Sequence, residues 1–77
     1  MKVDHWDYGY QPSGGTLEKF TVRDGETTTC VRVWWDGEGC HEDRMLRGLT
    51  ELQRALGFDR GQEAFDAWRS TLQGADA

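Results

Sequence analysis

The sequence predicts an α+β fold, in which a small antiparallel sheet of two or three strands is followed by two amphipathic helices packed on one face. Three observations lead to this prediction. The dipeptide Asp24-Gly25 separates two stretches rich in Thr, Val and aromatic residues, the apolar spacing changes from two to nearly four after residue 40, and a glycine divides the helical half. With 77 residues the chain is expected to form one domain, residues 1–77.

The β-hairpin is predicted from Asp24-Gly25, because glycine readily adopts the positive φ that a two-residue turn between antiparallel strands requires. If these two residues form the loop, Phe20 pairs with Thr29. Side chains alternate along a strand, so the hairpin has two faces. One face is a candidate core and carries Phe20, Val22, Thr29, Val31, Val33 and Trp35, whereas the other carries Leu17, Lys19, Thr21, Cys30, Arg32 and Trp34.

The segment Lys2–Tyr10 is predicted to supply a third strand, separated from the hairpin by a loop at Gln11–Gly15. Its position in the sheet stays open. Alternation places Trp6, Tyr8 and Tyr10 on one side of this strand and Val3, His5 and Asp7 on the other. The aromatic side either joins the core beside Phe20 or forms a strip for a partner.

A first amphipathic helix is predicted from about His41, because apolar residues recur there with a helical period. Its apolar face carries Met45, Leu46, Leu49, Leu52 and Leu56, and its solvated face carries Arg44, Arg47, Glu51 and Arg54. Gly57 suits a left-handed C-terminal cap, after which Phe58 is expected to fold back on Leu52.

A second helix is predicted after Asp59, which with Gln62 resembles a capping box. It is expected to end near Gln73 and to bury Ala64, Phe65, Trp68 and Leu72. The joint between the two helices also fits a helix-turn-helix DNA reader. We disfavour that function because the outer side of the second helix is not cationic.

Acidic residues are concentrated in the middle of a chain whose formal net charge is -5. Between residues 24 and 43 only Arg32 opposes the acids Asp24, Glu26, Asp36, Glu38, Glu42 and Asp43. This concentration favours a partner with a basic surface and argues against direct binding of nucleic acid, whose phosphates are neutralised by Lys and Arg. In the alternative interpretation, Glu42 and Asp43 only stabilise the first turn of a helix through its dipole.

No motif in the sequence indicates catalysis or a cofactor. Zinc is disfavoured because Cys30, Cys40, His5 and His41 lack the spacing of zinc ligands, and the acidic stretch 36–43 lacks the pattern of a calcium loop. Neither histidine has a nucleophile or acid partner recognisable in the sequence, so we expect no enzyme. No long apolar run or signal-peptide pattern is present, which predicts a cytoplasmic protein without membrane contact.

The features that the fold does not use predict protein binding. Adjacent strand residues point to opposite faces, so Trp34 lies on the outer face when Trp35 enters the core. There it is either exposed to a partner or covered by the first strand or Arg32. We expect an inhibitor or adaptor that occupies a basic, nucleic-acid-handling surface of a partner protein. Its expected contact residues are Asp24, Glu26, Trp34, Asp36, Glu38, Glu42 and Asp43.

In its small size, central acidity and exposed aromatic residues, the chain resembles phage-encoded inhibitors such as anti-CRISPR or anti-restriction proteins in general character. The resemblance implies a protein that acts by occupying a surface. Two alternatives stay open. One is a structural homo-oligomer, such as a homodimer, that pairs through the outer sheet face with Leu17 and Trp34, and the other is a metal-dependent sensor or enzyme built on Cys40, His41 and neighbouring carboxylates.

Overall fold

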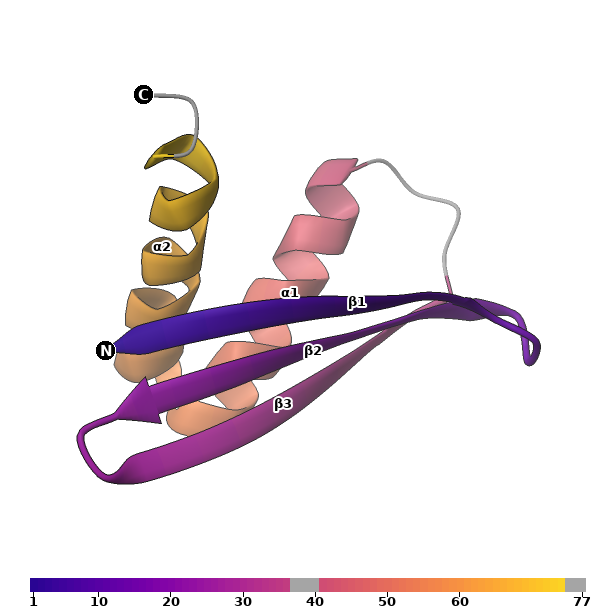
Figure 1. The fold of residues 1–77 in the computed structure, drawn as a ribbon. Coiled ribbons are helices and arrows are strands. Elements are labelled where there is room, and N and C mark those ends of the chain that lie inside the picture. Colours follow the sequence, from indigo (N-terminus) through magenta and orange to yellow (C-terminus); the bar gives the residue numbers. More distant parts are fainter. Residues whose placement is uncertain (37–40, 75–77) are drawn as a thin grey trace.

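A computed structural model of the chain describes residues 1–36 and 41–74. It has a three-stranded antiparallel sheet followed by two helices, which confirms the predicted α+β fold. Both helices lie on the same face of the sheet (Figure 1). The elements are β1 (Lys2–Gln11), β2 (Gly15–Asp24), β3 (Thr27–Trp35), α1 (His41–Leu56) and α2 (Phe58–Gly74). Neither helix of this described part combines the length and the apolar character needed to cross a membrane.

The sheet has β2 at its centre, so the first segment of the chain does supply a third strand, beside β2. The predicted register of the hairpin is wrong by two residues, because Phe20 faces Val31 rather than Thr29. The turn consists of Gly25 and Glu26, one residue later than predicted. Of these two, only Gly25 has a positive φ, 63°, which is typical of a type II′ turn. A shift by two keeps every side chain on its predicted face.

A bulge in β1 inverts the facing of its last residues. Pairing with β2 is regular up to Asp7 and resumes at Gly9 after a shift in register. Gly9 has a φ of 79°, and its backbone amide donates a hydrogen bond to the Asp7 carboxylate at 2.8 Å. Beyond the bulge Tyr10 pairs with Thr16, on the face that is directed toward the helices. The prediction that Tyr10 shares a face with Trp6 is therefore wrong, because one extra residue inverts the alternation.

The core lies between the two helices and the face of the sheet that is directed toward them, here called the inner face. Its buried members are Val3, Phe20, Val22, Val31 and Val33 of the sheet, Leu52 of α1, and Ala64, Phe65 and Trp68 of α2. Trp68 packs edge-on against Phe20 with ring centroids 5.0 Å apart, and Gly48 of α1 faces the same ring. The predicted core face of the hairpin is thus confirmed, although Thr29 and Trp35 at its ends are only half-buried.

Both predicted helices form, but some of their side chains are placed differently than expected. Leu46, Phe58 and Leu72, expected inside, are 62%, 73% and 50% exposed. Leu46 points outward because Arg44, predicted on the solvated face, instead reaches the sheet, which turns the opposite side of that helical turn to solvent. Phe58 is already the first residue of α2, so it is not a cap residue folded back on Leu52. Asp59 consequently lies within the first turn of α2 rather than at its N-cap.

Glycines shape the joint between the two helices. Gly57 has a φ of 94° and its amide donates to the Gln53 carbonyl at 2.9 Å, which confirms the predicted C-terminal cap. Gly61 faces the Gln53 backbone so closely that a Cβ atom at this position would clash with it. The absence of that side chain lets α2 return directly alongside α1.

Candidate functional site

The acidic residues expected to contact a partner lie at two ends of the molecule. Asp24 and Glu26, expected to add a second contact at the hairpin tip, stand at the β2–β3 turn. Asp36 follows β3, and Glu42 and Asp43 begin α1. The nine residues of β3 separate these groups, a length of about 30 Å in an extended strand. The two groups therefore form separate acidic surfaces. Glu38, the remaining acid of the predicted set, and Cys40 lie outside the described residues.

Several of these acids already have a role within the fold. Asp24 forms an ion pair with Arg60 of α2, which fastens the hairpin tip to the helices. Glu42 and Asp43 are exposed in the first turn of α1, where a negative charge favours the helix dipole. This placement agrees with the alternative interpretation of the acidic stretch as a helix start, and it leaves partner binding by these residues a prediction.

Trp34 lies on the outer face as predicted, opposite Leu17, but it is half-buried rather than fully presented. The backbone at Gly15 packs against its ring so tightly that a Cβ there would lie 2.5 Å from the indole Cζ2. The most exposed aromatic side chain on this face is instead Trp6, with 63% of its surface accessible, followed by Tyr8 at 46%. The first strand, rather than β3, therefore presents the aromatic side chains that a partner could contact.

The outer sheet face is the surface of the sheet directed away from the helices. Register places on it Lys2, Asp4, Trp6, Leu17, Lys19, Thr21, Arg23, Thr28, Cys30, Arg32 and Trp34, and the contact of Tyr8 with Lys19 adds Tyr8. Each of these residues is exposed or half-buried, and both described helices lie on the opposite side (Figure 1). Within residues 1–36 and 41–74, no secondary-structure element covers this face.

The outer sheet face is basic, although the chain as a whole has a net charge of -5. It holds four of the nine Lys and Arg residues, namely Lys2, Lys19, Arg23 and Arg32, but of the fourteen Asp and Glu residues only Asp4. Asp4 is paired with Arg23 at 3.2 Å between Oδ2 and Nη1. The outer sheet face therefore carries four cations against one acid, whereas the other acids of residues 1–36 and 41–74 lie elsewhere.

Cations and aromatic rings are interleaved on this face. Trp6, Lys19 and Arg32 form one row across the three strands, since Lys19 pairs with both of the others. The Lys19 ammonium lies 5.9 Å from the centroid of the Tyr8 ring. Planar rings offer stacking surfaces and the neighbouring cations attract anionic groups, so the arrangement suits an anionic ligand with planar groups.

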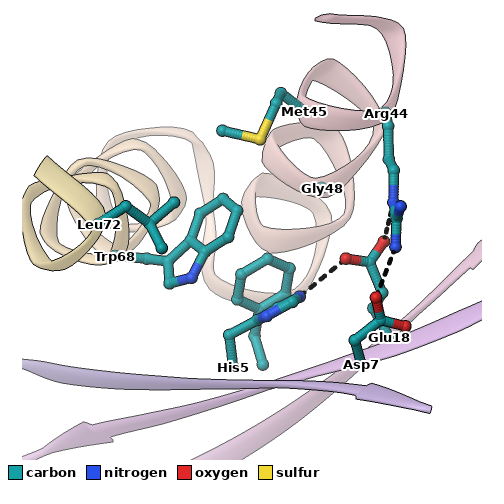
Figure 2. Close-up of a pocket in the computed structure, with 9 residues that line it drawn as sticks. His5, Asp7, Glu18, Arg44, Met45, Gly48, Trp68 and Leu72 are labelled. Atoms are coloured by element: carbon teal, nitrogen blue, oxygen red, sulfur yellow. Dashed lines mark hydrogen bonds and ion pairs between the residues drawn. The ribbon is translucent and has the colours of Figure 1, made fainter. Parts of the chain in front are cut away.

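A second constellation lies on the inner face, where His5, Glu18, Arg44 and Asp7 form a connected polar cluster beside a pocket of about 230 Å³ (Figure 2). His5 Nε2 lies 2.8 Å from Glu18 Oε1. Arg44 Nε donates to Glu18 Oε2 at 2.9 Å and Arg44 Nη2 to Asp7 Oδ2 at 3.1 Å. Glu18 is only 7% exposed, so these partners are what make its burial tolerable.

Electrostatics within this cluster favour the charged forms of Asp7 and Arg44. The hydrogen bond from the Gly9 backbone lowers the pKa of Asp7, and the hydrogen bond and charge of Arg44 lower it further. The hydrogen bond to Glu18 raises the pKa of Arg44 above its already high ordinary value. The cluster therefore fastens the start of α1 to β1 and β2 by charge-assisted hydrogen bonds.

No acid partner of His5 is recognisable in the sequence, and the structure corrects the expectation that it has none by placing Glu18 against it. The two residues are 13 apart in the chain and meet only because β1 and β2 pair. An imidazole held by a carboxylate is also the arrangement of many general bases. Here the same carboxylate is shared with Arg44, and the pocket walls are the apolar groups of Phe20, Met45, Trp68 and Leu72.

In the part of the chain that the structure describes, no group of three or more His, Cys, Asp or Glu is arranged to hold a metal ion. Comparisons with protein-family models, curated proteins and solved structures found no match.

Part of the outer sheet face could be predicted from the sequence. Strand alternation predicted that Lys19, Arg32 and Trp34 share a face, and the structure confirms this. What was missed is its charge, because acids and bases were compared along the chain rather than face by face. Lys2 joins the face only through the pairing of β1 with β2, whose position in the sheet the sequence left open, whereas Arg23 follows Lys19 and Thr21 in the alternation of β2.

Proposed function

We propose that this chain is a binding module, an adaptor or inhibitor, that contacts a macromolecular partner through its outer sheet face. One observation carries the proposal: an uncovered sheet face presents Trp6 at 63% exposure among four cations, on a chain of net charge -5. Neither Trp6 nor the four cations contribute to the core. An exposed tryptophan without a partner gains nothing in folding, and exposed aromatic patches commonly mark interaction sites.

The composition of the outer sheet face supports the same proposal. Trp, Tyr and Arg are the residues most enriched at the energetically dominant positions of interfaces, and Trp6, Tyr8 and Arg32 are all exposed here. Thr21 and Cys30 provide small side chains in the next row toward the hairpin tip, and Thr28 provides one in the row after it. The half-buried Trp34 adds apolar area at the far strand.

A second candidate keeps the contact expected from the sequence, in which Asp36, Glu42 and Asp43 face a basic, nucleic-acid-handling surface of a partner protein. Their common exposure at one end of the molecule supports it. Action as an inhibitor of the phage-encoded type, and a cytoplasmic location, stay predictions of the sequence. A homodimer joined face to face through the outer sheet face is disfavoured, because a two-fold contact would set its four cations against an identical set.

The proposal is tested by capture from an extract of the source organism with matched variants of the full chain. Trp6→Ala combined with Arg32→Ser removes an exposed ring and an exposed cation from the outer sheet face. Phe58→Ala combined with Arg54→Ser makes the same kind of change on the helices, where Phe58 is 73% exposed. Retained proteins and retained nucleic acids are both quantified.

We expect the outer-face variant to lose most of what the native chain retains, and the helix variant to keep it. Equal retention by the two variants would contradict the proposal. A third variant, Glu42→Lys with Asp43→Lys, tests the second candidate, which predicts that this change alone abolishes capture. Circular dichroism of each variant confirms that the fold is retained.

A further inference from the structure

We infer that the ligand of the outer sheet face is a single-stranded nucleic acid, an inference that rests on the proposed function of this face. The pattern of side chains carries it. A flat face that combines accessible aromatic rings with cations matches the way proteins bind single strands, by stacking bases and tracking the phosphate backbone. The stacking groups here are Trp6 and Tyr8 on β1, and the cations Lys19 and Arg32 lie in the same row as Trp6.

The accessible rings favour a single strand over a duplex. Bases in a duplex are already stacked and paired, so an aromatic side chain on a flat surface cannot reach their planes. Bases in a single strand can turn outward and stack on Trp6, whose ring is 63% exposed, and on Tyr8. Trp34 is half-buried against Gly15 and offers only part of its ring, so β1 is the main stacking edge.

The cations are placed to bind the backbone of such a strand. Lys19 and Arg32 extend the row of Trp6 across β2 and β3, so phosphates that flank a stacked base meet positive charge toward the middle of the sheet. Lys2 and Arg23 form another row four residues away along β1, a spacing of about 13 Å. Two cationic rows at that spacing allow a strand to contact the face at more than one phosphate.

The net charge of -5 does not oppose this binding at physiological salt. Charges in solvent are largely screened beyond about 8 Å at that ionic strength. The acids of α1 and α2 belong to helices that lie on the side opposite the outer sheet face. A strand on that face therefore meets Lys19 and Arg32 directly, while the acids of the helices are screened.

The test measures binding of a fluorescently labelled oligothymidylate of about twelve nucleotides to the full chain by anisotropy. A duplex of the same length, a polyglutamate peptide and vesicles of anionic lipid are measured in parallel. We expect the single strand to bind most tightly. Trp6→Ala should weaken its binding by roughly five- to a hundredfold, which is the range for loss of one stacked base.

Salt dependence gives a second readout that a structural role would not change. Lys19→Ala with Arg32→Ala should lower the slope of log affinity against log salt by about 1.4 if each cation neutralises one phosphate of a single strand. The helix variant Phe58→Ala with Arg54→Ser should match the native chain in both affinity and slope. Trp6→Ala should leave the slope unchanged, because it removes no charge.

Absence of oligothymidylate binding at low salt would overturn the inference, as would equal or tighter binding of the duplex, the peptide or the vesicles. Those results are distinguishable from failure of the proposed function. If single strands do not bind but the outer-face variant still loses a captured protein, the face binds an acidic protein and the proposed function stands. If capture is also unaffected by the outer-face variant, both are wrong.

Discussion

The two faces of the sheet are built from alternate residues of the same strands, yet they meet opposite requirements. On the inner face Phe20, Val22 and Val33 are 1–2% exposed, and the buried charge of Glu18 is matched by His5 and Arg44. On the outer face Trp6 is exposed and sits in a row with two cations. Folding accounts for the inner residues, whereas it gives no reason for the outer ones. The difference supports the proposed role of the outer sheet face as a contact surface.

The largest contrast between the faces should appear in stability. Phe20→Ala is expected to lower the free energy of unfolding by about 3–5 kcal/mol, because it empties a buried site beside Trp68. Trp6→Ala, on the outer face of the adjacent strand β1, should change the free energy of unfolding by no more than about 0.5 kcal/mol. Urea unfolding followed by circular dichroism measures both. Phe20→Leu provides a milder inner-face variant if Phe20→Ala does not fold. If Trp6→Ala lowered the free energy of unfolding as much as the inner-face variant does, the two faces would not differ in their contribution to stability.

Two arginines sharpen the contrast for charged side chains. Arg44→Met removes the hydrogen-bonded cation beside the buried Glu18 and should cost about 2 kcal/mol of stability. Arg32→Met, on the outer face, should be within about 0.5 kcal/mol of the native chain. The same unfolding experiment applies. Equal losses of stability in the two variants would show that the outer cations support the fold, which would contradict their assignment to binding alone.

The inner cluster should also make stability depend on acidity. The pKa of Asp7 in the folded chain is below its ordinary value of 3.8, so the folded chain binds fewer protons at this residue than the unfolded chain does. The resulting stabilisation is complete above about pH 4 and is lost as the pH falls through the folded pKa. Asp7→Asn should therefore flatten the acid-side fall in unfolding free energy. An unchanged acid-side profile would show that Asp7 is not coupled to folding.

The smallest effect is expected for the ion pair on the outer face. Asp4 and Arg23 are each about half exposed, with side-chain accessibilities of 52% and 53%. A double-mutant cycle with Asp4→Ala and Arg23→Ala should give a coupling below about 1 kcal/mol. The matching cycle at Glu18 and Arg44 should give a clearly larger value, because Glu18 is buried. Comparable couplings would remove the electrostatic distinction between the faces.

Much of the fold followed from local patterns. Strand alternation predicted that Phe20, Val22, Val31 and Val33 enter the core, and Gly57 predicted the end of the first helix. The hairpin register was missed because Asp24-Gly25 and Gly25-Glu26 both satisfy a two-residue turn, and a slip by two leaves the faces unchanged. The bulge at Gly9 was missed because one glycine within a strand does not reveal an extra residue.

The site was harder to predict than the fold, because it depends on pairing between distant strands. Nothing in the order of residues shows that His5 meets Glu18, or that Arg44 turns inward to both Glu18 and Asp7. Likewise, the acids between residues 24 and 43 are divided into two groups by the length of β3. Charge counted along a sequence therefore misrepresents charge presented by a surface when strands alternate between two faces.

The most direct test of the outer sheet face as a site for single strands uses its own thiol. Cys30 is exposed on that face, and Cys40→Ser leaves it as the reactive thiol. The rate of maleimide addition is measured with and without the oligothymidylate. As a control, Cys30→Ser, Cys40→Ser and Ser70→Cys together move the thiol to an exposed position on α2. If single strands bind the outer sheet face, the oligothymidylate should protect Cys30 severalfold and should not protect the α2 thiol. Equal rates of Cys30 modification with and without the oligothymidylate would contradict binding at this face.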